Sequence, residues 1–228
     1  MQPAHAKVNL WLNVVGRRAD GYHLLDSLVA FADLADTLEV EASGRLTLDV
    51  KGPHAAALAR EADNLVLKAA RLLGGHAGIE PGAAFTLTKN IPLASGLGGG
   101  SADAAAALRA LCRLWCLALP ERELAGLAVQ LGADVPMCLM ERTAIAGGIG
   151  EKLAAAPALP ACGLLLVNPG VSLPTADVFR ARRGALSAPR AVERPWRDLD
   201  GLVAALAERG NALAGDELSG MPPPRGGH

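Results

Sequence analysis

The amino-acid sequence predicts a protein that combines β-strands with α-helices, and three features support this prediction. Residues 6–15 alternate apolar and polar side chains, which is the period of a strand. Residues 64–73 repeat apolar side chains at helical spacing, and residues 92–106 place a glycine-rich loop directly before an alanine-rich apolar run. With 228 residues the chain can bury a sizeable core, as one large domain or two small ones.

The overall composition excludes several classes of function. The net charge of −1 provides no excess of positive charge for nucleic acid. The apolar runs are too short to cross a membrane, and the N-terminus lacks the pattern of a signal peptide. We therefore expect a cytoplasmic protein without nucleic-acid or membrane partners. The four cysteines do not have zinc-site spacing, so they are predicted to be core thiols, and we expect no protein-bound metal.

The first predicted strand, residues 6–15, places Lys7 and Asn9 on one face. These side chains line a site or, alternatively, form the solvated face of an antiparallel strand. Asp20-Gly21 is a turn signal, and Tyr22 and His23 follow it. A flat ring beside a polar neighbour can stack on a heterocycle and hydrogen-bond to it. The alternative is an ordinary surface turn.

The next stretch continues with strands and a helix. Residues 24–31 read as an apolar strand, and residues 36–41 and 45–50 alternate as in a β-hairpin or meander. Residues 64–73 predict a helix, with Asp63 as its N-cap and Gly74-Gly75 as its end. Residues 84–89 predict a strand that leads into the glycine-rich loop.

The loop itself contains four glycines in five positions, Gly96 and Gly98 to Gly100. Ser101 is a suitable N-cap and Asp103 suits the dipole of the helix expected over 104–117. A glycine loop that opens a helix directs several N–H groups at one spot, which favours phosphate. The pattern is not a P-loop, because no Lys follows the last glycine. It is not a Rossmann fingerprint either, because the spacing of the glycines differs from that motif. A flexible loop before a core helix is the alternative.

Asp134 is the carboxylate of interest in the second half of the chain. A helix is predicted over 120–131 and ends before Asp134, and Pro136 is expected to hold Val135 extended. A carboxylate among small and apolar residues is expected to be partly buried, and such groups need a partner or a task. A plain helix-terminal aspartate in a turn is the alternative.

The remaining elements are less regular. Residues 163–167 predict a buried strand, and a helix is expected to start near Thr175. Residues 180–195 read as a loop and 199–206 as a short helix. From about residue 215 the composition predicts a disordered tail.

Five segments taken together resemble the GHMP small-molecule kinases and, among these, the 4-diphosphocytidyl-2-C-methyl-D-erythritol kinases. The specific part of the match is the Asp20-Gly21-Tyr22-His23 turn together with the Gly98-Gly99-Gly100-Ser101-Ala102-Asp103 loop. The segments are residues 3–9, 18–23, 92–106, 131–136 and 168–175. The resemblance runs from about residue 3 to about residue 214, whereas the family continues to a third glycine-rich motif.

This resemblance implies an α+β fold in two parts. The first, residues 1–147, is the nucleotide-binding and catalytic domain, and the second, 148–228, is an incomplete substrate-side domain. The implied reaction is transfer of the γ-phosphoryl group of ATP to the 2-hydroxyl of 4-diphosphocytidyl-2-C-methyl-D-erythritol, in the non-mevalonate route to isoprenoid precursors. Two alternatives remain: a catalytically silent nucleotide-binding remnant, and another GHMP kinase that phosphorylates a different small alcohol.

The resemblance also assigns roles to residues. Asp134 is the expected catalytic acid–base residue, and Lys7 is its positively charged partner. The substrate-binding positions are Asn9, Tyr22, His23 and Thr175. The ATP-binding positions are Pro92, Leu93, Ala94, Ser95, Gly96, Leu97, Gly98, Gly99, Gly100, Ser101 and Ala102, with Asn64, Leu65 and Lys89 beside the adenine. Mg²⁺ is expected to accompany ATP, held mainly by phosphates and water. The expected assembly is a monomer or weak homodimer with small-molecule partners.

Overall fold

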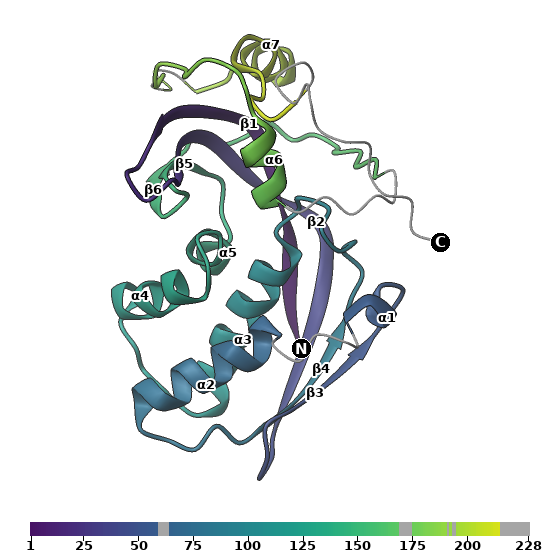
Figure 1. Cartoon of the computed structure of the whole chain (residues 1–228). Coiled ribbons are helices and arrows are strands. Elements are labelled where there is room, and N and C mark those ends of the chain that lie inside the picture. The colour runs from purple at the N-terminus through teal and green to yellow at the C-terminus, as the bar shows by residue number, and fades with distance from the viewer. Residues whose placement is uncertain (59–63, 169–174, 191, 193–194, 215–228) are drawn as a thin grey trace. The chain divides into compact units, whose positions relative to one another are not determined.

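The computed structural model of the chain describes residues 1–58, 64–168, 175–190, 192 and 195–214 (Figure 1). The chain divides into two compact units that interleave along the sequence. The first unit comprises Met1–Lys7, Ala32–Leu93 and Leu97–Glu141, and the second comprises Val8–Phe31, Ala94–Gly96 and Arg142–His228. The expected domain boundary after residue 147 stays a prediction.

Two long strands contribute residues to both units: β1 (Gln2–Arg17) and β2 (His23–Ala42). The strands predicted over 6–15, 24–31 and 36–41 are all present within them. The solvated-face interpretation of the first strand is wrong, because Lys7 and Trp11 are both buried.

The sheet of the first unit is centred on β4 (Ala83–Thr88), whose Phe85 and Leu87 are buried. β4 pairs antiparallel with the end of β2 and parallel with β3 (Thr47–Lys51). The predicted hairpin of residues 36–41 and 45–50 is therefore wrong, because β4 lies between the two strands. The alternating apolar and polar side chains identify both strands but do not show which strand each one pairs with. The apolar side chains of β4 favour the central position, and the more exposed β3 suits an edge.

The helices of the first unit are α1 (Ala55–Leu58), α2 (Leu65–Ala77), α3 (Gly99–Leu114), α4 (Glu121–Leu131) and α5 (Val135–Met140). In Figure 1, α2 to α5 form a layer beside the strands of this unit. The alanines of α3 are buried together with Leu108 and Leu111. Small side chains let neighbouring helices approach closely, so α3 forms the centre of this layer.

The ends of α2 differ from the prediction. Asn64 is the N-cap, and its side chain accepts a hydrogen bond from Val66 N at 2.8 Å. Asp63 lies outside the described residues. The helix continues through Gly74-Gly75 and ends at Gly78, where φ is 67°. The left-handed conformation of Gly78 terminates the helix, whereas Gly74 and Gly75 are part of it.

The ends of α3 and α5 also correct the sequence-based expectations. α3 begins at Gly99 with Gly98 as its N-cap, so Ser101 is not the cap and Asp103 lies beyond the first turn. The helix ends at Leu114 rather than 117. Val135 is helical, not extended, because Pro136 lies in the first turn of α5, where a missing N–H costs nothing.

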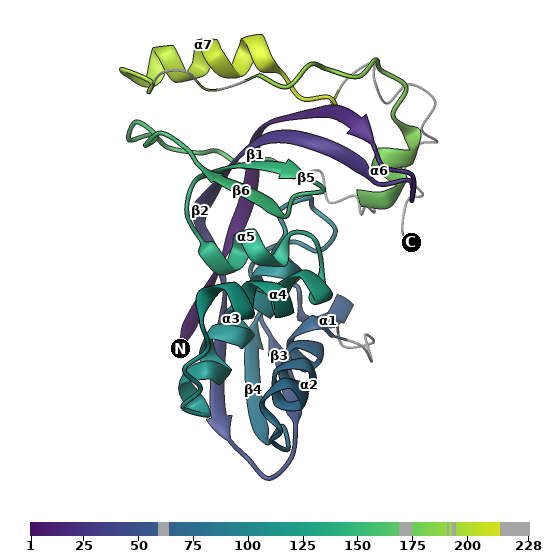
Figure 2. The same cartoon turned by 90° about the vertical axis from the view of Figure 1, so that its left-hand side faces the viewer.

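In the second unit, β5 (Ala144–Gly148) pairs antiparallel with both the first part of β2 and β6 (Lys152–Ala155). The unit also contains α6 (Thr175–Ala181) and α7 (Leu199–Arg209), which agree with the predicted helices. Figure 2 shows α7 beside the part of β1 that belongs to this unit, and Ala212 N, just after α7, donates to Leu12 O of β1 at 2.7 Å.

The predicted buried strand over 163–167 is wrong. No described strand pairs with this segment, and the side chains of Leu165 and Val167 are 89% and 84% exposed. An apolar run becomes a buried strand only when neighbouring strands satisfy its backbone groups. The described residues of the predicted 180–195 loop that follow α6 are irregular, and the predicted tail from 215 lies outside the described residues.

Candidate active site

A single ion pair joins the two residues expected to be catalytic. Lys7 Nζ donates a hydrogen bond to Asp134 Oδ2 at 2.9 Å, although 127 residues separate them. β1 supplies Lys7, which is almost fully buried, and Asp134 precedes α5 with 37% of its side chain exposed. The carboxylate is thus held from one side by a cation and stays accessible from the other.

The glycine loop is attached directly to Lys7. The backbone N–H of Lys7 donates to Leu97 O at 2.8 Å. A Cβ added at Gly98 would lie 3.2 Å from Lys7 Cβ, and the φ of Gly98 is +66°. Both the close approach and the left-handed backbone require glycine at this position. The loop therefore brings the start of α3 against the residue that holds Asp134.

The start of α3 has the properties of an anion site. Its hydrogen bonding begins with Ala102 N to Gly98 O at 2.9 Å, so the N–H groups of Gly99, Gly100 and Ser101 lack an acceptor within the helix. Aligned N–H groups and the helix dipole favour a negative ligand such as phosphate. Leu65 at the start of α2 borders this place, because its Cδ1 is 3.6 Å from a Cβ added at Gly100.

A buried ionic trio of Asp36, Lys89 and Asp103 lies beneath the same loop. Lys89 Nζ donates to Asp36 Oδ2 and, at 2.7 Å, to Asp103 Oδ2. All three side chains are at most 4% exposed. Burial raises the pKa of Asp103 to about 7, with Lys89 opposing the shift and Asp36 adding to it. Lys89, expected beside the adenine, is thus committed to two carboxylates.

Arg109 of α3 contacts the C-terminal end of α5, opposite the end that lies next to Asp134. It donates to the carbonyls of Cys138 and Leu139 at 2.9 and 3.2 Å and pairs with Glu141 at 3.2 Å. These contacts satisfy the last carbonyls of the helix that starts after Asp134. Burial raises the pKa of the Cys138 thiol to about 12, so this thiol is structural rather than reactive. The expectation that the cysteines are core thiols holds for Cys138 and is wrong for Cys116 and Cys162, which are exposed.

The expected substrate residues lie in the second unit. Asn9 Nδ2 donates to Ser27 Oγ at 2.7 Å, which orients the amide. Tyr22 is 57% exposed, and its N–H donates to Asp20 Oδ1 at 3.3 Å in the predicted turn. Thr175 is exposed at the start of α6.

His23 stacks on Phe179 of α6, with ring centroids 5.3 Å apart and an interplanar angle of 22°. Burial lowers the pKa of His23, and the positive charges of Arg17 and Arg182 lower it further. The imidazole therefore favours its neutral form, which provides one donor and one acceptor. Loop residues Ala94 to Gly96 also belong to this unit, and Ala94 has a φ of +48°.

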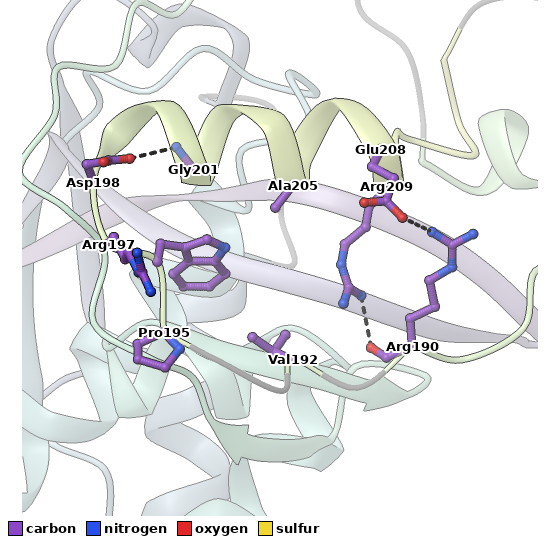
Figure 3. A pocket seen from close by; sticks show the side chains of 10 residues that line it. Arg190, Val192, Pro195, Arg197, Asp198, Gly201, Ala205, Glu208 and Arg209 are labelled. Carbon is purple, nitrogen blue, oxygen red and sulfur yellow. Dashed lines mark hydrogen bonds and ion pairs between the residues drawn. The ribbon is translucent and has the colours of Figure 1, made fainter.

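A separate cavity of about 450 Å³ lies between α7 and the segment before it, and none of the expected site residues lines it (Figure 3). Several of its charged side chains are held by hydrogen bonds or an ion pair within this unit. Arg190 pairs with Glu208 at 3.1 Å, Arg209 donates to Arg190 O at 2.9 Å, and Asp198 caps α7 through Gly201 N at 2.8 Å. We place the chemistry at Lys7 and Asp134 instead, because this carboxylate is accessible and its partner Lys7 is hydrogen-bonded to the glycine loop.

Sequence reasoning missed Asp36, Arg109 and Phe179. Asp36 and Arg109 had one available signal each, because both are charged residues within apolar stretches that become buried elements. Phe179 had none, because its stacking partner is 156 residues away in the sequence, as the numbers of His23 and Phe179 show.

Comparison with known proteins adds an independent result. Residues 64–142 match the family described as GHMP kinases N terminal domain. The chain is 53% identical to the 4-diphosphocytidyl-2-C-methyl-D-erythritol kinase of Ruegeria pomeroyi, over 96% of this chain and 76% of that protein. The kinase of the same name from Paramagnetospirillum magneticum is also 53% identical, over 92% and 73%. The chain thus spans about three quarters of the length of these relatives.

Solved structures agree. A crystal structure of a 4-(cytidine 5'-diphospho)-2C-methyl-D-erythritol kinase matches with a TM-score of 0.71 and 39% identity, over 92% of this chain and 74% of that one. Homoserine kinase from Cytophaga hutchinsonii matches with a TM-score of 0.55 at 18% identity, over 80% and 59%, which shows a shared fold. The α+β architecture expected from the sequence is therefore confirmed.

Proposed function

We propose that this chain, which belongs to the 4-diphosphocytidyl-2-C-methyl-D-erythritol kinase family, transfers the γ-phosphoryl group of ATP to the 2-hydroxyl of 4-diphosphocytidyl-2-C-methyl-D-erythritol. The reaction would supply a phosphorylated intermediate of the non-mevalonate route to isoprenoid precursors. The observation that carries the proposal is the Lys7–Asp134 ion pair, attached to the glycine loop through Lys7 N and Leu97 O.

Phosphoryl transfer needs positioning, neutralisation of charge and a place for the hydroxyl proton. We assign the proton to Asp134, which accepts it from the 2-hydroxyl or orients that hydroxyl. Lys7 fixes the carboxylate and places a positive charge where negative charge develops on the transferred group. The partial exposure of Asp134 leaves the carboxylate accessible to a substrate.

The nucleotide phosphates are assigned to the N–H groups at the start of α3. The loop positions Pro92 to Ala102 and the start of α2, Asn64 and Leu65, would surround the nucleotide. Mg²⁺ would enter with ATP and neutralise phosphate charge. Mg²⁺ gives up its water ligands reluctantly, so phosphates and water would supply most of its ligands.

The cytidyl group is assigned to Tyr22 and His23. The His23–Phe179 stack and the exposed ring of Tyr22 offer flat surfaces for a base, and neutral His23 offers hydrogen bonds to it. Asn9 and Thr175 supply further polar contacts to the substrate.

The cellular setting is part of the same proposal. No helix in the described part of the chain is long and apolar enough to cross a membrane. We propose a cytoplasmic enzyme that acts on a small molecule, as a monomer or weak homodimer without nucleic-acid partners.

The test is a transfer assay with ATP, Mg²⁺ and the cytidyl substrate, with formation of the 2-phosphorylated product followed directly. Homoserine and mevalonate, offered separately, serve as control alcohols. The proposal predicts transfer to the cytidyl substrate alone. Comparable transfer to a control alcohol would contradict the substrate assignment, and ATP binding without any transfer would favour the silent remnant.

A further inference from the structure

The buried ionic trio of Asp36, Lys89 and Asp103 has an unbalanced charge. One ammonium faces two carboxylates, so the trio would carry one net negative charge if both were ionised. An uncompensated buried charge is costly, and a carboxyl group usually relieves it by taking up a proton.

The hydrogen bonds show which carboxyl group takes the proton. Asp36 Oδ1 accepts from Asn90 N and Ile91 N at 2.6 and 2.8 Å, and its other oxygen accepts from Lys89. Three donors strongly favour an ionised carboxylate. Asp103 accepts only from Lys89 through Oδ2, and its buried Oδ1 has no partner. Asp103 is therefore the protonatable member.

The trio holds the glycine loop from both sides. Lys89 directly follows β4 and lies three positions before Pro92, whereas Asp103 lies in α3 just after the loop. A Cβ added at Gly99 would lie 3.3 Å from Lys89 Nζ, so the ammonium lies directly against the loop backbone. Asp36 adds hydrogen bonds to the segment between Lys89 and Pro92.

We propose that Asp103 is a positioning residue that acts through Lys89 on the glycine loop, and that its neutral form favours an anion bound there. The inference rests on the proposed function, because the anion is the phosphate group of ATP. With Asp103 protonated the trio is neutral, and with Asp103 ionised it places one negative charge under the phosphate site. ATP binding thus favours proton uptake by Asp103.

The charges around Asp103 are consistent with this assignment. Those that shift its pKa come from Lys89, after β4, and from Asp36, on β2. Lys7 on β1 and Asp134 before α5 neutralise each other. α2, which packs on α3, carries Lys68, Arg71 and His76, and His76 pairs with Glu123 of α4. Arg109 on α3 itself is paired with Glu141, which follows α5.

The test compares the dissociation constant of Mg–ATP in the whole chain and in Asp103→Asn between pH 6 and pH 8.5. The ionisation of the nucleotide is common to both proteins and cancels. As pH rises, we expect ATP binding to the parent chain to weaken by roughly three- to thirtyfold more than binding to Asp103→Asn. This is the range expected when one partly buried unit charge repels the bound phosphates. Asp49→Asn, which neutralises an exposed carboxylate of β3, should behave as the parent chain.

A variant whose affinity differs from the parent by the same factor at every pH would overturn the inference, because a purely structural role gives that result. A parent chain that binds no nucleotide at any pH would overturn the proposed function and the inference with it. If Asp103→Asn does not fold, calorimetry of the parent chain at pH 8 in two buffers of different protonation enthalpy decides. Proton uptake beyond that of the nucleotide supports the inference, and its absence overturns it.

Discussion

The two compact units hold their functional side chains in different ways. In the first unit, charged groups are paired and buried: Lys7 holds Asp134, and Lys89 holds Asp36 and Asp103. In the second unit, His23 and Phe179 rely on ring stacking, and Tyr22 is more than half exposed. Removing one partner of a buried ion pair lowers the free energy of unfolding by several kcal/mol, whereas removing a partly exposed ring lowers it little. The first unit should therefore tolerate substitution poorly, and the second should respond mainly through substrate affinity.

Removing the carboxylate charge of Asp134 should give the largest effect. Asp134→Asn is expected to lower kcat about 10²–10⁴-fold, the usual contribution of a general base, while ATP affinity stays unchanged. Steady-state transfer to the cytidyl substrate measures the first, and nucleotide titration the second. Asp49→Asn is the matched control, since this carboxylate is 64% exposed and belongs to the same unit. Activity within tenfold of the parent chain would remove Asp134 from the chemistry.

Stability against pH distinguishes the buried trio from the exposed groups. The pKa of Asp103 is about 7 in the folded chain and near 3.8 without the fold, so the folded chain binds more protons between these values. Its contribution to stability is complete below about pH 4 and is lost as pH rises through 7. We expect the urea concentration at the unfolding midpoint to decrease as pH rises from 5 to 8. Asp103→Asn should flatten this trend, because at pH 8 it removes a loss of unfolding free energy on the order of a few kcal/mol.

Urea unfolding of the nucleotide-free chain at pH 5, 7 and 8 measures this trend. Equal slopes in parent and variant would contradict a protonated Asp103. The Asp49→Asn control should follow the parent chain throughout.

Removing the ring of Tyr22 should have a smaller effect, confined to one ligand. Base stacking is worth roughly 1–3 kcal/mol, so Tyr22→Ala should raise the dissociation constant of the cytidyl substrate by about 5- to 150-fold. Tyr22→Phe keeps the ring and should bind nearly as the parent chain does. Calorimetric titration with each ligand separates the outcomes, because an equal loss of ATP affinity would reject the assignment of Tyr22 to the cytidyl group.

Much of this arrangement could be predicted from local sequence, and what failed was pairing over long distances. The order of strand, glycine loop and helix is confirmed because glycine content and apolar periodicity are local properties. The hairpin of 36–41 and 45–50 failed because the alternation in both segments does not reveal that β4 lies between them. The strand at 163–167 failed for the same reason, since five apolar residues do not specify a partner strand.

The site shows the same division. Lys7 and Asp134 were paired through the resemblance to known kinases, and the ion pair at 2.9 Å agrees with that pairing. Asp103 was expected to serve the helix dipole, but Lys89 and Asp36 reach it across 14 and 67 positions of sequence, and the buried pairing determines its pKa. The roles of the individual residues in binding stay predictions until the variants are measured.

The smallest expected effect concerns His23 in the second unit. Burial and the charges of Arg17 and Arg182 lower its pKa below 6.5, so the unfolded chain binds more protons at acidic pH. Stability should consequently decrease as pH falls below 6.5, and only slightly, because the imidazole is only partly buried. A titration of the His23 ring signals by NMR should give a pKa below 6.5, and Arg182→Gln should move it upward. Phe179→Leu, which removes the stacked ring, should move it upward as well by exposing the imidazole to water. If neither substitution changes the titration, the lowered pKa does not come from these neighbours, and His23 should then be treated as an ordinary surface histidine.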